Sequence, residues 1–188
     1  MRIITGKAKG IRLETLEGEK TRPTSERVKE AVFSMLQFDI EGRRVLDLFA
    51  GSGQMALEAI SRGAKEAILV DKAKDAVAVI NKNIAKTKLT EACRVFCLDW
   101  SDYIRRFSGE KFDIIFLDPP YAAGLYAPAL SALLSADMLK PTTLIVCESD
   151  SAEIFAKDTS LAARFKEVKV SKYSKTVITI LTPVAEEG

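Results

Sequence analysis

Short apolar runs alternate with amphipathic segments from residue 43 onward, and this alternation constrains the fold more than any other feature of the sequence. The apolar runs have the length of buried strands and occupy 45–48, 67–70, 95–98, 114–117 and 144–147. Helical patterns separate them, at about 53–62, 73–86, 101–107 and 125–139. Strands that alternate with helices imply βαβ units with right-handed crossovers and a parallel sheet. The sequence therefore predicts an α/β fold.

The last part of the chain departs from this alternation. A weak helix is expected near 151–157. Two strand-like segments follow, at 166–173 and 176–182, with only Ser174 and Lys175 between them. This pattern predicts an antiparallel hairpin on the edge of the sheet.

The first part of the chain is expected to be an extension, residues 1–42, in front of a main domain of residues 43–188. Residues 2–14 predict a short hairpin. A helix is expected over about 24–37, because its apolar residues recur at helical spacing. That stripe consists of Val28, Ala31, Val32, Met35 and Leu36. Lys29 lies off the stripe, so we expect it to face away from the core.

Composition excludes several kinds of site. The 188 residues include no histidine, which removes Ser-His-Asp catalysis and histidine metal ligands. Cys93 and Cys97 would lie about 13 Å apart on one strand, too far for a disulfide. With Cys147 they are expected to be reduced core thiols, and they do not form a metal site. Neither a membrane span nor a signal peptide is visible, so we expect a cytoplasmic protein without a membrane partner.

A glycine turn follows the first predicted strand, in the segment Asp47-Leu48-Phe49-Ala50-Gly51-Ser52-Gly53. Glycines allow a tight turn and let a ligand approach the backbone, and the following helix N-terminus can hold an anion. The second strand ends at Asp71, where a carboxylate suits paired ribose hydroxyls. The third ends at Asp99-Trp100, where Asp99 could accept from an adenine amino group and Trp100 could pack near the ring. Together these residues predict a nucleoside-binding crevice.

Two cofactors compete for this crevice. The spacing from Gly51 to Ala56 also satisfies the dinucleotide fingerprint of a dehydrogenase. The acid-first form of the turn fits S-adenosylmethionine better, and a dehydrogenase would usually use a histidine, lysine or tyrosine as its acid or base. The candidate cofactor-binding residues are Asp47, Phe49, Ala50, Gly51, Gly53, Asp71, Lys72, Asp99, Trp100 and Asp118.

The fourth apolar run ends abruptly in Asp118-Pro119-Pro120-Tyr121. Each proline lacks an N–H and fixes φ, so the strand stops there. A carboxylate, backbone carbonyls and an aromatic ring at a strand's carboxyl end suit an exocyclic amine on a planar base, because the amine donates and the ring can stack. A tight turn with a capping aspartate is the alternative. These four residues are the candidate catalytic group.

Basic residues are concentrated at the start of the chain, where no acid occurs before Glu14. This imbalance favours contact with an RNA backbone over an ordinary solvated surface. The candidate RNA-binding residues are Arg2, Lys7, Lys9, Arg12, Arg22 and Arg27.

Four segments resemble the RsmD family of bacterial 16S rRNA guanine-N2 methyltransferases: MRIITGKAKG, TRPTSERVKEAVFSML, DLFAGSGQMALEAISRGA and LDPPY. The resemblance implies a Rossmann-like class I methyltransferase fold. Its sheet would have seven mostly parallel strands with a C-terminal antiparallel hairpin, preceded by a small N-terminal hairpin-and-helix extension. One departure is Gln54-Met55-Ala56, where relatives carry a turn richer in Gly, Ala and Leu. We expect it to alter contacts to the methionine end of the cofactor.

The same resemblance implies the activity. S-adenosylmethionine would be the methyl donor, and the acceptor would be N2 of a guanine in 16S rRNA, guanine 966 in the usual rRNA numbering. The substrate would be a 30S particle or an assembly intermediate, and the enzyme a monomer. Two alternatives stay open: an adenine-N6 methyltransferase on DNA or RNA, and a non-catalytic RNA-binding assembly factor.

Overall fold

The structure is a computed structural model that describes residues 1–16, 26–120, 124–155 and 157–185. The chain divides into two compact units, Met1–Asp99 and Trp100–Gly188. The N-terminal extension lies inside the first unit. The separate domain boundary expected after residue 42 stays a prediction.

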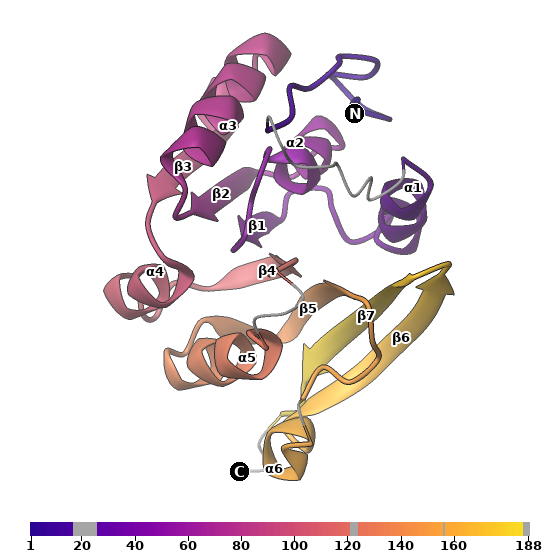
Figure 1. Cartoon of the computed structure of the whole chain (residues 1–188), viewed down its shortest axis with the longest axis vertical. Coiled ribbons are helices and arrows are strands. Elements are labelled where there is room, and N and C mark those ends of the chain that lie inside the picture. Colours follow the sequence, from indigo (N-terminus) through magenta and orange to yellow (C-terminus); the bar gives the residue numbers. More distant parts are fainter. Residues whose placement is uncertain (17–25, 121–123, 156, 186–188) are drawn as a thin grey trace. The chain divides into compact units, whose positions relative to one another are not determined.

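The first unit contains three parallel strands, with β2 in the middle. They are β1 (Arg44–Asp47), β2 (Glu66–Asp71) and β3 (Cys93–Cys97). Helix α2 (Gln54–Ser61) connects β1 to β2, while α3 (Lys74–Thr87) and the 3-10 turn η1 (Thr90–Ala92) connect β2 to β3 (Figure 1). Because the strands are parallel, their carboxyl ends lie at one edge of this sheet.

The second unit contains parallel strands β4 (Phe112–Leu117) and β5 (Leu139–Ser149). Strand β7 (Thr176–Pro183) runs antiparallel to both β5 and β6 (Phe165–Tyr173), as expected for the C-terminal hairpin. Its helices are α4 (Trp100–Arg106), α5 (Tyr126–Ser135) and α6 (Thr159–Ala162) (Figure 1). The expected class, a Rossmann-like methyltransferase fold with seven mostly parallel strands and this hairpin, is confirmed by the described residues.

One helix was predicted in the wrong place. The described residues of 151–157 form no helix, and α6 begins only at Thr159. The reason is local, because the Asp158 side chain accepts a hydrogen bond from the Leu161 N–H, 2.9 Å away. An aspartate in this arrangement sets the start of a helix immediately after itself.

Cys93 is half-buried and Cys147 is buried, as expected of core thiols, but the same expectation was wrong for Cys97, which is exposed. Cys97 is the last residue of β3, and β3 pairs with β2 alone among the described strands. Cys93 and Cys97 lie at the two ends of β3, and no cysteine of the described chain forms a disulfide. Burial raises the pKa of the Cys93 thiol to about 12 and raises that of Cys147 further. Both thiols are therefore protonated and unreactive at neutral pH. No described helix is both long and apolar enough to cross a membrane.

The N-terminal hairpin is reduced to one antiparallel bridge, between Arg2 and Arg12. Backbone hydrogen bonds close it, including Ile3 N to Ile11 O at 2.9 Å. The turn of the hairpin lies against the end of α2, where Lys7 N donates to Ser61 O at 2.8 Å. The Ser61 hydroxyl accepts from Ala8 N at 2.9 Å, so both backbone and side-chain groups of α2 attach the hairpin to the first unit.

Helix α1 (Glu26–Met35) buries Val28 and Val32, as its apolar stripe predicts. The expectation for Lys29 was wrong, because this side chain is fully buried. Its ammonium lies 3.3 Å from the Glu58 carboxylate in α2 and donates to the Arg2 carbonyl at 2.5 Å. A lysine can be buried when it has such partners.

Glu58 is fully buried and collects donors from several elements. The backbone N–H groups of Ile4 and Thr5 donate to its two oxygens at 2.8 and 3.0 Å. Arg62 donates to it from the end of the same helix, at 2.8 Å. Burial lowers the pKa of Lys29, and the neighbouring Glu58 charge opposes that shift. This carboxylate thus holds the N-terminal residues, α1 and α2 together.

We expect Glu58→Gln to lower the free energy of unfolding by about 3–5 kcal/mol, because Lys29 would keep its burial and lose its counter-ion. Urea denaturation of the full chain measures this. Glu30→Gln, a neutralised exposed acid on α1, is the control and should change stability by less than about 0.5 kcal/mol. Adding Lys29→Met to Glu58→Gln should recover part of the loss. Equal midpoints for wild type and Glu58→Gln would contradict this account.

Candidate functional site

The glycine turn lies between β1 and α2 and is held by backbone hydrogen bonds. Ala50 N donates to Val70 O of β2 at 2.9 Å, and Gly53 N donates to Ala50 O at 2.6 Å. Gly51 and Gly53 have φ values of 52° and 78°, in the left-handed region that favours glycine. The turn therefore needs glycine at both positions.

The two glycines differ in their surroundings. A Cβ atom on Gly53 would lie 3.0 Å from Leu69 Cδ2 and 3.4 Å from Ile80 Cγ1, so packing leaves it no room. A Cβ atom on Gly51 would meet nothing within 4 Å. The side of the turn at Gly51 is therefore open, and a ligand can approach the backbone there.

Asp71 connects the end of β2 to this turn. Its Oδ2 accepts from Gly51 N and its Oδ1 from Ala73 N, both at 2.9 Å. Each carboxylate oxygen can accept a further hydrogen bond. Asp71 is half-buried, so it can position the turn and still take hydroxyl donors from a ligand.

Asp47 ends β1 and is buried. Burial raises the pKa of its carboxyl to about 7; the nearby Asp71 charge raises it as well, while hydrogen bonds from the Ala56 and Phe49 backbone lower it. Ala56 is in the first turn of α2, so these bonds fix the start of that helix beside the turn. Direct contact between Asp47 and a cofactor stays a prediction.

Asn83 was missed by the sequence reasoning. This fully buried side chain of α3 donates from Nδ2 to Ser52 O at 2.9 Å and to Glu14 O at 3.0 Å. Its Oδ1 accepts from Glu14 N at 2.7 Å. It therefore joins the middle of the glycine turn to the N-terminal segment. A polar residue on the same helical face as Ile80 and Ile84 was the available signal.

Gln54 is the first residue of α2, directly after the turn. Its Oε1 is buried and has no hydrogen-bond partner among the described residues. A buried acceptor without a donor costs about 1–3 kcal/mol. A ligand bound at the glycine turn can supply this donor. The turn thus combines open backbone, an unpaired acceptor and a carboxylate, which fits a nucleoside cofactor that carries hydroxyl and amino groups.

The predicted cofactor residues of the first unit lie at the carboxyl ends of its strands. This edge carries Asp47, Phe49, Ala50, Gly51, Gly53, Asp71, Lys72 and Asp99. Asp99 follows β3 by two residues and is half-buried, whereas Lys72 is exposed. The structure therefore brings these eight residues to one edge of the sheet, as the parallel order requires.

The second unit carries the other predicted site residues. Strand β4 ends at Leu117, immediately before Asp118 and the two prolines, as expected. Asp118 and Pro120 are exposed, and Pro119 is buried. Trp100 is half-buried at the start of α4. Tyr121 lies outside the described residues.

The predicted RNA-binding residues of the described chain are all exposed: Arg2, Lys7, Lys9, Arg12 and Arg27. Arg2 forms an ion pair with Glu26 at 3.2 Å. Arg22 lies outside the described residues. In the part of the chain that the structure describes, no group of three or more His, Cys, Asp or Glu side chains could hold a metal ion.

Comparison with known proteins gives one consistent family. Residues 1–182 match the family described as "Conserved hypothetical protein 95". Ribosomal RNA small subunit methyltransferase D of Haemophilus influenzae is 36% identical over 80% of this chain and 79% of its own. The protein of the same name from Escherichia coli K12 is 34% identical, over 80% and 75%.

Similarity to solved structures supports the same assignment. "Putative methyltransferase yhhF" from Escherichia coli matches with a TM-score of 0.85 at 27% identity, covering 99% of each chain. The family match spans the N-terminal extension, the glycine turn and the Asp118 segment, so it includes every candidate site residue. The chain belongs to the RsmD family of S-adenosylmethionine-dependent methyltransferases.

Proposed function

We propose that this protein methylates the exocyclic N2 of a guanine in 16S rRNA, guanine 966 in the usual rRNA numbering. The observation that carries the proposal is the family match over residues 1–182, together with a β4 strand that ends at an exposed Asp118 and two prolines. Relatives named ribosomal RNA small subunit methyltransferase D support the substrate class. The protein acts as a monomer on a 30S particle or an assembly intermediate in the cytoplasm.

The first unit holds the cofactor. When bound, S-adenosylmethionine supplies a methyl group on a positively charged sulfur. Asp71 accepts from the ribose hydroxyls, and Asp99 accepts from the adenine amino group. Gln54 Oε1, which lacks a partner in the described chain, accepts from the amino group at the methionine end. The open backbone at Gly51 receives the same end of the cofactor. Each contact pairs an acceptor of this chain with a donor of the ligand.

The segment after β4 holds the base. A guanine must leave its stack to enter such a site, which costs a few kcal/mol. Stacking on Tyr121 offsets part of that cost, by about 1–3 kcal/mol. The Asp118 carboxylate and the Pro119 carbonyl accept from the guanine amino group and orient its lone pair. The two prolines keep this segment rigid, so the acceptors are placed before the base arrives.

Asp118→Ala should lower turnover by roughly 100-fold or more, because the amine loses the acceptor that orients it. Calorimetry should show an unchanged affinity for S-adenosylmethionine. Asp102→Ala, which removes a half-buried acid of α4 that pairs with Arg105, is the matched control and should keep the wild-type rate. A wild-type rate for Asp118→Ala would remove this residue from the mechanism.

Gln54→Leu should separate cofactor binding from stability. The affinity for S-adenosylmethionine should fall roughly tenfold, because a hydrogen bond to a charged donor contributes about 1.5–3 kcal/mol. Without cofactor, the variant should unfold at the same temperature or a higher one, since a buried unpaired acceptor is gone. Calorimetry and thermal unfolding measure the two effects. Gln37→Leu, the same substitution at an exposed side chain outside the site, should change neither. A Gln54→Leu variant with full affinity would refute the contact.

The activity itself is tested with labelled S-adenosylmethionine, 16S rRNA and 30S particles from cells that lack this protein. Nuclease digestion followed by nucleoside analysis should give N2-methylguanosine, and mass mapping should locate it at guanine 966. We expect faster methylation of particles than of naked rRNA. N6-methyladenosine would support the alternative adenine enzyme. RNA binding without any methylated product would support a non-catalytic assembly factor.

A further inference from the structure

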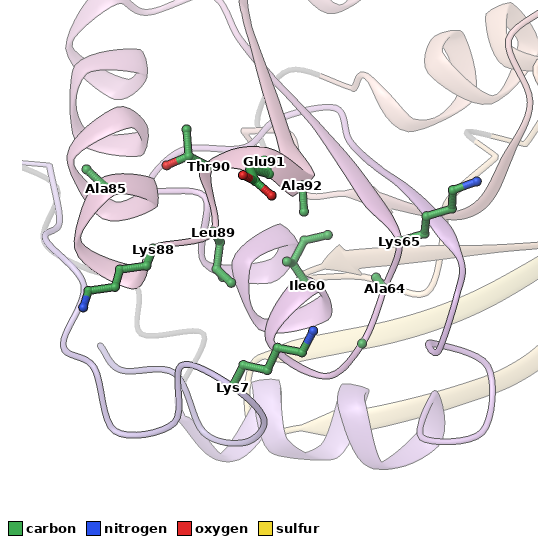
Figure 2. Close-up of a pocket in the computed structure, with 11 residues that line it drawn as sticks. Lys7, Ile60, Ala64, Lys65, Ala85, Lys88, Leu89, Thr90, Glu91 and Ala92 are labelled. Carbon is green, nitrogen blue, oxygen red and sulfur yellow. The ribbon is translucent and has the colours of Figure 1, made fainter.

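The first unit contains a cavity of about 810 Å³ that the proposed chemistry does not use. It is lined by the ends of α2 and α3, by η1, by the residues that lead into β2, and by the turn of the N-terminal hairpin (Figure 2). Three lysines are among the lining residues: Lys7, Lys65 and Lys88. Glu91 is the acid among them.

This cavity is separate from the cofactor site. Lys65 immediately precedes β2, and Asp71 is the last residue of that strand. Six residues of extended chain span about 20 Å. The cavity therefore lies at the amino-terminal edge of the sheet, while the glycine turn and its carboxylates lie at the carboxyl edge.

The charge of the cavity is not neutralised by its neighbours. Lys7, Lys65 and Lys88 are exposed, and none of them forms an ion pair with another described residue. In Figure 2 the Lys7 ammonium reaches toward Ile60, while Lys65 and Lys88 lie on two opposite flanks of the cavity. Three cations against one carboxylate leave a net positive, concave surface.

The backbone conformation of Lys88 is a second, independent indication that its side chain has a function. Lys88 ends α3 with a φ of 58°, in the left-handed conformation that usually carries glycine at this position. Glycine adopts this conformation more easily than lysine does. The chain therefore carries a positive charge here in spite of an unfavourable backbone conformation. That charge lies on the rim of the cavity.

We propose that this cavity binds the sugar-phosphate backbone of the RNA substrate, at a nucleotide remote from the methylated guanine. The three lysines contact phosphates. Glu91 accepts from a 2′-hydroxyl, the group that distinguishes RNA from DNA. The inference rests on the proposed function, because it assigns a second contact to the same substrate.

The test is a triple variant, Lys7→Ala, Lys65→Gln and Lys88→Gly, chosen to preserve the fold. The Lys7 N–H that donates to Ser61 is retained, and glycine suits the backbone at position 88. A single-stranded phosphate contact contributes about 0.7 to the slope of log affinity against log salt. Removing three should reduce the slope by about 2, so between about 50 and 200 mM salt the wild type should lose roughly 20-fold more affinity for a 16S rRNA transcript than the variant.

Lys86→Ala is the matched control, because Lys86 is an exposed lysine of α3 that does not line the cavity. It should keep the wild-type slope. The triple variant should raise KM for rRNA, with cofactor affinity unchanged and an unfolding temperature that is the same or higher, because glycine suits the backbone at position 88. A wild-type slope and KM would overturn the proposal, as would weaker cofactor binding or a lower unfolding temperature. If wild type methylates no guanine in rRNA, the proposed function fails, and the slope comparison on the same transcript still decides the RNA contact.

Discussion

The buried carboxylate of Glu58 is the interaction on which the first unit depends most. It faces the backbone N–H groups of residues 4 and 5, the Lys29 ammonium of α1 and the Arg62 guanidinium. A single desolvated charge therefore fixes three segments that are distant in the sequence. Because α2 begins at the glycine turn, holding the middle of this helix also holds the turn. The cost of burying the charge is offset only while all of its donors are present.

The same turn is fixed from its other sides by polar side chains of three elements. Asp47 accepts a hydrogen bond from the backbone of Ala56 in the first turn of α2. Asp71 accepts from the Gly51 N–H, and Asn83 donates to the Ser52 carbonyl. Backbone groups that are held in this way do not need to reorganise when a ligand binds, which lowers the entropic cost of binding. The Gln54 oxygen has no partner among the described residues, and this is the basis of the proposal that the cofactor supplies a donor to it.

The sequence predicted the strands and the glycine turn because both are local signals. Apolar runs of about four residues, bounded by glycine or proline signals, are typical of short strands, and two glycines directly after such a run favour a tight turn. Lys29 was expected at the surface, and Asn83 was not identified as a functional residue. Both side chains are buried because they have polar partners, and these partners cannot be seen in the local sequence pattern. The partners of Asn83 are 31 and 69 residues away in the chain, beyond what a helical pattern can show. Tyr121 and Arg22 lie outside the described residues, so their places stay predictions.

The two edges of the first sheet differ in the charged groups that they carry. Acceptors and carboxylates follow the carboxyl ends of β1 to β3, and unpaired lysines surround the amino ends of β2 and β3. About 20 Å of strand separates them, more than twice the Debye length of about 8 Å at physiological salt. A cationic cofactor and a polyanionic RNA can therefore be held by one small unit without either charge weakening the site of the other. Were the three cavity lysines also placed at the carboxyl edge, in addition to Lys72, they would oppose the positive charge of the sulfonium and attract phosphate into the cofactor crevice.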